Sequence, residues 1–135
     1  MILVSVRLIT DNVRRLVDFY ENLLCVPASW SNDDFAEVVT SHGTLAIGST
    51  RTVGIFAPGA ARPADNQSAI IEFLVDDVDA EFARLAPTGV DVVTEPMTMP
   101  WGNRSLVLRD PDDNLVNLFT PASAAAIAKF QRYSR

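Results

Sequence analysis

The sequence predicts an α+β fold made of two βαβββ modules, and three observations support this. A β-like run, an Asp and an amphipathic helical pattern follow one another twice, at residues 9–20 and 75–86. Short β-like runs come after each helical pattern. A stretch at 57–68, rich in Pro, Ala and polar residues, separates the two copies as a connector would.

The first module begins with the apolar run "MILVSVRLIT", which we interpret as a strand. In "ITDNVRRLVDFY" (9–20), Asp11 is well placed to accept hydrogen bonds from the first backbone N–H groups of a helix. The apolar stripe of that helix is Val13, Leu16, Val17 and Tyr20. The runs "FAEVVT", "TLAIGS" and "TVGIFA" then predict three strands.

The second module repeats this pattern in "VDDVDAEFARLA" (75–86), where Asp77 takes the place of Asp11. When these two residues are aligned, the apolar positions of the two helices coincide. Three more strands are predicted in "VDVVTE", "RSLVLR" and "NLVNLF". The last two should form a hairpin, because the turn at 110–114 contains Pro, Asp and Asn.

These elements place the chain in one domain over residues 1–135. Module one covers about 1–57, a linker covers 58–68, and module two covers about 69–120. The Ala-rich tail 121–135 predicts an appended helix.

Composition limits the partners and the compartment. The net charge of −6 argues against nucleic acid and anionic membranes. The single cysteine excludes an intrachain disulfide and fits a reducing cytoplasm, which we take as the expected location. The N-terminal apolar run is too short to span a membrane and is interrupted by Arg7.

Two βαβββ modules in one chain resemble the vicinal oxygen chelate superfamily of glyoxalases, extradiol dioxygenases and bleomycin-resistance proteins. Within it, "DDFAEVVTSHGTLAIGS" (33–49) and "PWGNRSLVLRDPDDNL" (100–115) are most similar to the bacterial bleomycin-resistance group. The resemblance implies cup-shaped curved sheets and a homodimer. The C-terminal tail, the linker and Arg7 depart from the family pattern.

Catalytic members of this superfamily hold a divalent metal with His, Gln or Glu side chains inside the cup. The resemblance places the ligand positions at Val4, Ile70, Asn117 and around Ala46. Val, Ile and Ala cannot coordinate a metal, and Asn is a poor neutral ligand. The only histidine, His42, falls in a "SHG" turn. We therefore predict no metal, no cofactor and no catalytic residue.

The same resemblance implies a drug-binding sandwich between Trp101 and Phe35, from the same or a partner subunit. Stacking between aromatic rings adds roughly 0.5–1.5 kcal/mol beyond area burial. The alternative is that both aromatics close the edge of the core against the tail. The neighbouring Gly102 suits a loop tip and favours ligand binding for Trp101, whereas the two interpretations of Phe35 remain balanced.

Further candidates surround this sandwich. Acidic neighbours favour a cationic ligand tail: Asp33, Asp34 and Glu37. Glu72 shares strand parity with Ile70 and is a base of raised pKa, a partner for a cation, or a solvated carboxylate. Asn117 either bonds a ligand or bonds across strands. Trp30 is a weaker candidate, for which a structural role is favoured.

The leading functional hypothesis is a metal-free protein that sequesters a planar, antibiotic-like natural product. The alternative is a glyoxalase-type or dioxygenase-type enzyme with an atypical site. Module symmetry pairs Arg7 with Phe73, which faces the helix layer. Arg7 would then pair with a carboxylate such as Asp18 or reach a subunit interface, unless the register of the first strand differs.

Overall fold

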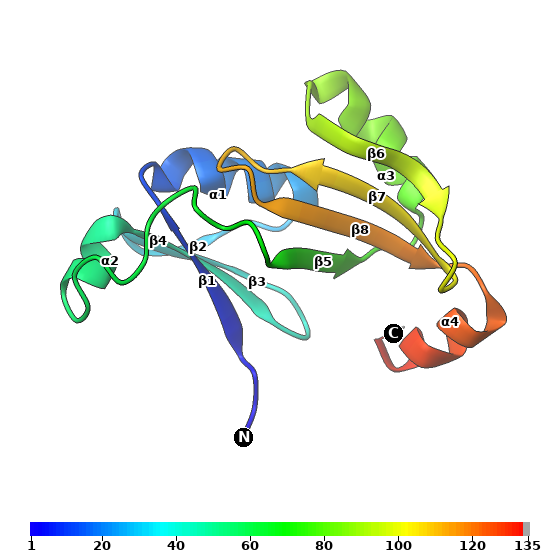
Figure 1. The fold of residues 1–135 in the computed structure, drawn as a ribbon, viewed down its shortest axis with the longest axis horizontal. Coiled ribbons are helices and arrows are strands. Elements are labelled where there is room, and N and C mark those ends of the chain that lie inside the picture. The colour runs from blue at the N-terminus through cyan, green and yellow to red at the C-terminus, as the bar shows by residue number, and fades with distance from the viewer. Residues whose placement is uncertain (134–135) are drawn as a thin grey trace. The chain divides into compact units, whose positions relative to one another are not determined.

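The structure is a computed structural model that describes residues 1–133. Its contacts divide the chain into two units, Met1–Gln67 and Ser68–Arg135. Each unit contains one βαβββ module, so the predicted α+β fold and the internal repeat are confirmed (Figure 1). Residues 134 and 135 of the predicted tail lie outside the described residues.

The first unit forms a four-stranded sheet with the strand order β1-β4-β3-β2. Edge strand β1 runs parallel to β4, and the other neighbours are antiparallel. The elements are β1 (Ser5–Thr10), α1 (Val13–Leu24), β2 (Ser29–Asn32), β3 (Phe35–Val39), β4 (Thr44–Ser49) and α2 (Thr50–Gly54).

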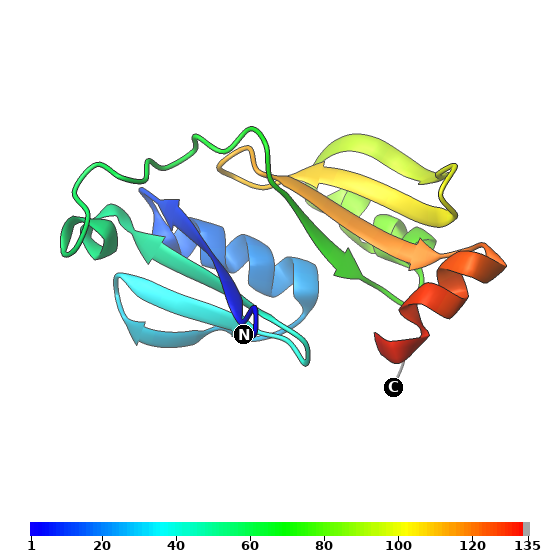
Figure 2. The same ribbon diagram turned by 60° about the horizontal axis from the view of Figure 1, so that its bottom comes forward.

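The second unit repeats this topology with the order β5-β8-β7-β6 (Figure 2). Its elements are β5 (Ile70–Leu74), α3 (Val78–Leu85), the 3-10 turn η1 (Ala86–Thr88), β6 (Asp91–Thr98), β7 (Asn103–Arg109), β8 (Leu115–Pro121), α4 (Ala124–Phe130) and the 3-10 turn η2 (Gln131–Tyr133). No helix among residues 1–133 is long and apolar enough to cross a membrane.

One face of each sheet is covered by the long helix of its module. In the first unit the fully buried residues include Leu16, Val17 and Tyr20 of α1, together with Ala36, Val38 and Ile47 of the sheet. In the second unit they include Val78 of α3, together with Leu106, Leu108, Val116 and Leu118.

The opposite face of each sheet is called its open face below, and strand alternation with the pairing register defines its residues. The open face of the first sheet carries Arg7, Ile9, Phe35, Glu37, Ala46 and Gly48. The open face of the second carries Ile70, Glu72, Leu74, Ser105, Val107, Asn117 and Phe119.

The expected cap of α1 is wrong by one residue. The N-cap is Asn12, whose Oδ1 accepts from the backbone N–H of Arg15 at 3.1 Å. The N-cap of α3 is Asp77, as predicted, and accepts from two backbone N–H groups. The two modules therefore align through Asn12 and Asp77. Each residue of β1 then corresponds to the residue of β5 one position earlier than the sequence alignment predicted.

Three other boundaries differ from the expectations. The run "TVGIFA" is not a strand: it lies in α2 and the turn after it, because the Ser49 hydroxyl accepts from the backbone N–H of Arg51 and starts a helix. The short edge strand β2 was missed. The predicted tail helix starts only at Ala124, because β8 continues to Pro121 and the Ser123 side chain provides the N-cap.

Candidate functional site

The predicted hairpin is present as β7 and β8, and its turn is held by internal bonds. Asp110 is buried, and its Oδ1 accepts from the backbone N–H groups of Asp112 and Asn114 at 2.8 and 2.9 Å. Its Oδ2 accepts from the Asn114 side-chain amide at 2.7 Å. Asp113 has a φ of 64°, which an Asp tolerates in a turn. This network explains why the turn is formed by Asp and Asn, with no ligand required.

The opposite end of the hairpin presents Trp101 to solvent, with 69% of its surface exposed. Its neighbour Gly102 is buried and has a φ of 96°. The Gly102 carbonyl accepts from the backbone N–H groups of Ala122 and Ser123, at 2.8 and 3.0 Å. A Cβ on Gly102 would lie 2.8 Å from the Cβ of Ser123. Gly102 therefore makes the close approach of the segment before α4 feasible, whereas Trp101 stays outside the core.

The contact between the tail and the second sheet is made by other aromatics. The ring of Phe119 on β8 lies 5.0 Å from the ring of Phe130 on α4, edge to face. Phe119 is on the open face, so α4 covers one end of that face, while α3 covers the opposite face (Figure 1). Phe119 and Phe130 thus close the edge of the sheet against the tail helix, the role that the core-closure alternative assigned to Trp101.

Glu72 and Asn117 are adjacent on the open face of the second sheet. They are register partners in β5 and β8, and the Asn117 Nδ2 donates to Glu72 Oε2 at 2.8 Å. This bond fixes which amide atom is the oxygen, and Asn117 Oδ1 is buried with no hydrogen-bond partner. Two further buried atoms on β7, Ser105 Oγ and Asn103 Oδ1, also have no partner. Unused buried polar atoms of this kind are uncommon in folded proteins.

Phe35 and Glu37 lie on the open face of the first sheet, and both are partly exposed. Arg7 is on the same face, with its guanidinium carbon 5.2 Å from the centroid of the Phe35 ring. The expectation that Arg7 faces the helix layer is wrong, because Asn12 and not Asp11 caps α1. Arg7 is the structural equivalent of Glu72: Arg7 pairs with Ala46 as Glu72 pairs with Asn117.

Trp30 lies on the other side of the first sheet. It pairs with Ala36, whose side chain faces α1, and the Arg14 guanidinium lies over its ring at 4.2 Å. Trp30 therefore packs beside α1 and does not share a face with Phe35. The structural role favoured for it agrees with this placement.

Asp33 and Asp34 line a pocket of about 310 Å³ in the first unit, which Phe35 and Glu37 do not line. Its lining is Asp11, Asn12, Val13, Arg14, Trp30, Asp33, Asp34, Ser49 and Arg51. Asp34 accepts from Arg51 Nη2 at 2.6 Å, and this bond lowers the pKa of the Asp34 carboxyl. The acidic neighbours are thus divided: Glu37 shares the open face with Phe35, and the other two lie at this pocket.

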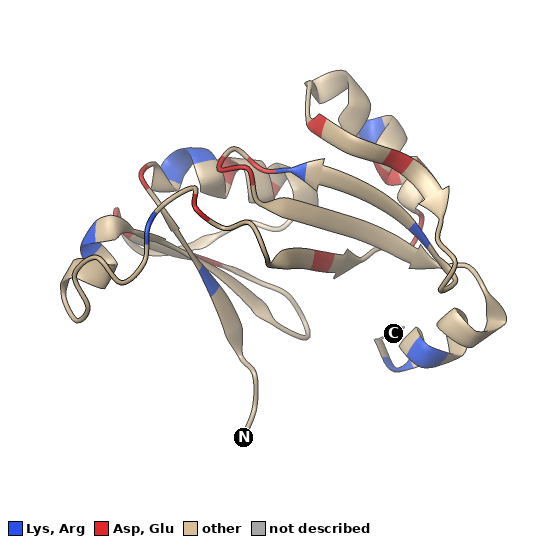
Figure 3. Ribbon diagram, viewed as in Figure 1, with Lys and Arg blue, Asp and Glu red and all other residues tan. Residues whose placement is uncertain are grey.

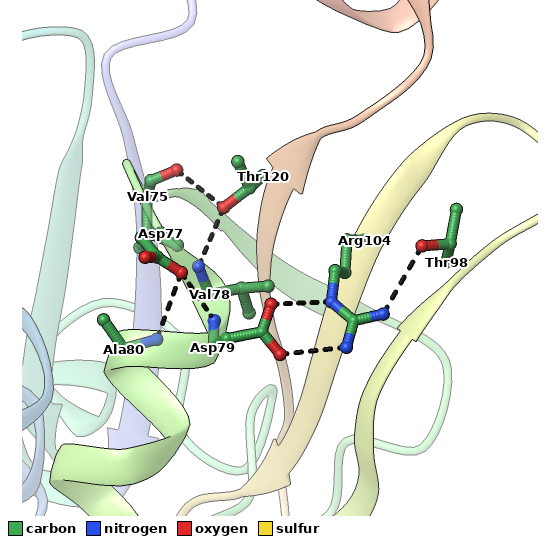
Figure 4. Close-up of polar contacts among 8 residues, drawn as sticks. All are labelled: Val75, Asp77, Val78, Asp79, Ala80, Thr98, Arg104 and Thr120. Carbon is green, nitrogen blue, oxygen red and sulfur yellow. Dashed lines mark hydrogen bonds and ion pairs between the residues drawn. The ribbon is translucent and has the colours of Figure 1, made fainter.

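A second ion pair ties α3 to the hairpin (Figure 4). Arg104 Nε donates to Asp79 Oδ2 at 2.7 Å, and Nη2 donates to Oδ1 at 2.9 Å. This bidentate geometry lowers the pKa of Asp79. Thr120 Oγ1 accepts from the backbone N–H of Val78 at 2.9 Å and donates to the carbonyl of Val75 at 3.0 Å. Sequence reasoning missed these contacts, which fix the helix on the covered face of the sheet.

The residues present do not fit a divalent metal at the positions where the resemblance would place its ligands. The residues seven positions before the two N-caps are Ser5 and Ile70. The first-module equivalent of Ile70 is therefore Ser5 and not Val4, which precedes β1. The pairing register makes Ala46 the equivalent of Asn117. Among residues 1–133, no three His, Cys, Asp or Glu side chains lie close enough together to hold a metal ion. His42 is exposed and lies 2.8 Å from the Ser41 hydroxyl.

Comparison with known proteins identifies the relatives of this fold. The uncharacterised Bacillus subtilis protein YraH is 26% identical over 125 residues, covering 88% of this chain and 98% of YraH. A superfamily member from Sphaerobacter thermophilus is 25% identical with a TM-score of 0.70, over 89% of this chain and 97% of that one. A family enzyme from Burkholderia phytofirmans shares the fold with a TM-score of 0.77 at 16% identity, over 90% of this chain and 99% of that one.

A family model matches residues 2–118, which covers both modules and ends one residue after Asn117. The match spans β1 to β7, both long helices and residues 115–118 of β8, and it stops before α4. The chain therefore belongs to the glyoxalase/bleomycin resistance protein/dioxygenase superfamily.

Proposed function

We propose that this protein binds a planar, cationic small molecule without a metal ion and sequesters it. The class of ligand is an antibiotic-like natural product, as the similarity to bleomycin-resistance proteins suggests. The proposal assigns the polar anchor to the open face of the second sheet. It is formed by the Glu72 carboxylate and the Asn117 amide.

The observation that carries the proposal is the unused Asn117 Oδ1. It is buried and has no partner, and a buried acceptor without a hydrogen bond costs about 1–3 kcal/mol. The amide cannot simply be reversed, because its Nδ2 already donates to Glu72 at 2.8 Å. A ligand N–H directed at Oδ1 would remove this cost, and the adjacent carboxylate favours a ligand that carries positive charge.

The surroundings of this anchor suit a flat, partly apolar ligand. Ile70 and Leu74 flank Glu72 on the same face of β5, with 53% and 37% of their surfaces exposed. Trp101 offers a further exposed aromatic surface in the second unit. Apolar walls with a few placed polar groups are the usual composition of small-molecule sites.

Binding is favoured over catalysis by the neighbours of Glu72. We call the register partners that follow one another across a sheet a row. The row of Glu72 contains Asn117 on β8, Val107 on β7 and Thr94 on β6. None of these three side chains is an acid or a base that would exchange protons with Glu72 near neutral pH. The carboxylate is therefore suited to attract a cation and is poorly supported as one member of an acid–base pair.

We also propose a cytoplasmic homodimer. The N-terminal segment before β1 exposes Ile2, Leu3 and Val4, with 84%, 85% and 67% of their surfaces exposed. Val6 on edge strand β1 is 50% exposed. A second copy that covers this strand would remove both an apolar surface and an open sheet edge.

Benzamidine, a planar amidinium, is a suitable probe for the anchor. Calorimetric titration of the protein in EDTA should show binding, and Glu72→Gln should weaken it about tenfold by removing the charge. Asn117→Leu should weaken it similarly. Glu95→Gln removes an exposed carboxylate elsewhere in the second unit and should leave the affinity unchanged. Binding that needs an added divalent metal, or that is insensitive to Glu72→Gln, would contradict the proposal.

A further inference from the structure

We propose that the open face of the first sheet carries a subsite for a planar anion, formed by Arg7 and Phe35. The chemical class is an aromatic carboxylate, whose carboxylate would bind the guanidinium while its ring packs beside Phe35. This subsite belongs to the first unit and the Glu72 anchor to the second, and the inference does not rest on the anchor. β1 carries a basic position where β5 carries an acidic one (Figure 3).

The first support is the unused hydrogen-bonding capacity of Arg7. A guanidinium has five N–H donors in a rigid plane. Within the described part of the chain, Arg7 makes no hydrogen bond and no ion pair, and its guanidinium lies 5.2 Å from the centroid of the Phe35 ring in a cation–π contact. Packing against the ring restricts the guanidinium while its N–H groups stay available, which lowers the entropy cost of binding an anion.

The second support is the contrast between equivalent rows of the two sheets. Glu72 pairs with Asn117, whose amide bonds to it, whereas Arg7 pairs with Ala46, whose methyl group cannot. Glu37 is the next residue in the row of Arg7, on the far side of Ala46. No ion pair within 4.0 Å joins Glu37 to Arg7 in the described structure. The chain therefore supplies a partner for the charge in one row and none in the other.

The third support is the shape of the surface next to the guanidinium. The central strand β4 presents Ala46 and Gly48 on this face, between the longer side chains of β1 and β3. A Cβ on Gly48 would lie 3.5 Å from the Phe35 ring and 2.8 Å from Thr52 Oγ1. The small residue at position 48 thus lets Phe35 and α2 approach the sheet, and Ala46 and Gly48 are themselves buried beneath their neighbours, so the accessible ring on this face is that of Phe35.

These features select one kind of anion. A planar carboxylate can accept two parallel N–H bonds from the guanidinium, and an attached ring can pack beside the partly exposed ring of Phe35. Glu37 on the same face disfavours a second negative charge on the ligand. The subsite therefore prefers a flat monoanion to a phosphate or a dicarboxylate.

The test uses benzoate and benzamidine, two probes of nearly the same shape and opposite charge. Benzoate should shift the ¹H–¹⁵N resonances of β1, β3 and β4, and Arg7→Gln should weaken its binding about tenfold or more. Arg7→Lys keeps the charge but loses the planar donors, so it should restore only part of the affinity. Arg62→Gln, an exposed arginine in the linker, is the matched control and should bind benzoate as the wild type does.

The outcomes separate this subsite from the Glu72 anchor. Glu72→Gln should leave benzoate binding unchanged, so the failure of one proposal leaves the other standing. Equal benzoate affinity in the wild type and Arg7→Gln would overturn the inference. Shifts centred on the pocket of Trp30 and Arg14 would also overturn it, as would benzamidine binding at Arg7 as tightly as benzoate. Because Arg7 is exposed, its variants should retain the melting temperature of the wild type.

Discussion

Replacement of Trp101 by Ala tests whether this indole acts in binding or in stability. With 69% of its surface exposed, only the remaining 31% packs against the protein. A tryptophan carries on the order of 250 Å² of buriable surface, so about 80 Å² is involved. At about 25 cal/mol per Å², the loss of stability should be at most about 2 kcal/mol.

This limit is distinguishable from the cost of removing a core aromatic. Tyr20 is fully buried beside the first sheet, and Tyr20→Ala should cost about 3–5 kcal/mol. Thermal unfolding followed by circular dichroism compares the two variants, since 1 kcal/mol shifts the melting temperature by about 2–8 °C in domains of this size range. Trp101→Ala should unfold closer to the wild type than Tyr20→Ala does.

The same variant should lose affinity for a planar ligand. With 9-aminoacridine as a planar cationic probe, calorimetry should show a loss of roughly 1–3 kcal/mol of binding free energy, as for a stacking aromatic. Trp30→Phe should change the affinity little, because Trp30 packs against Arg14 beside α1. A strongly destabilised Trp101→Ala with unchanged affinity would refute the binding role.

Three further predictions concern the turn, an ion pair and assembly. Gly102→Ala should lower the free energy of unfolding by about 2–4 kcal/mol in a denaturant titration, because φ is positive and the new Cβ meets Ser123. The control Gly59→Ala should cost about 1 kcal/mol, because φ is positive there but the new Cβ enters open space. The pKa of Asp34 is lowered by Arg51, so the contribution of this carboxylate to stability is present above the unfolded pKa and is lost as the pH falls through the folded pKa. Arg51→Gln should raise the Asp34 pKa toward 3.8 in an NMR titration. An unchanged pKa would contradict the ion pair. Sedimentation at micromolar concentration should give a dimer, and a mass near the 14.7 kDa monomer would count against it.

The repeat and most strands could be predicted from the sequence because they follow local periodicity. The cap of α1 could not be fixed, because Asp11 and Asn12 are adjacent and both residue types cap helices well. That one-residue error was enough to assign Arg7 to the wrong face, since strand side chains alternate. The sequence also offered "TVGIFA" as a strand, although the Ser49 cap starts a helix there.

The candidate site shows the same division between local and long-range information. Strand parity correctly predicted that Glu72 shares a face with Ile70. The hydrogen bond between Glu72 and Asn117 could not be predicted. These two residues are 45 positions apart, and their contact depends on the parallel register of β5 and β8. Trp30 and Phe35 are close in sequence but lie on opposite faces, because the chain reverses between β2 and β3 with an irregular register at Trp30 and Asn32.

The central claim is that Asn117 and Glu72 form a metal-independent anchor for a donor-bearing planar cation. The most direct measurement is the ¹H–¹⁵N signal of the Asn117 side-chain amide during titration with benzamidine in EDTA. The signal should shift in a saturable manner in the wild type, and Glu72→Gln should require about tenfold more benzamidine for the same shift. An Asn117 signal that stays unchanged in EDTA, or that shifts only after a divalent metal is added, would contradict the claim.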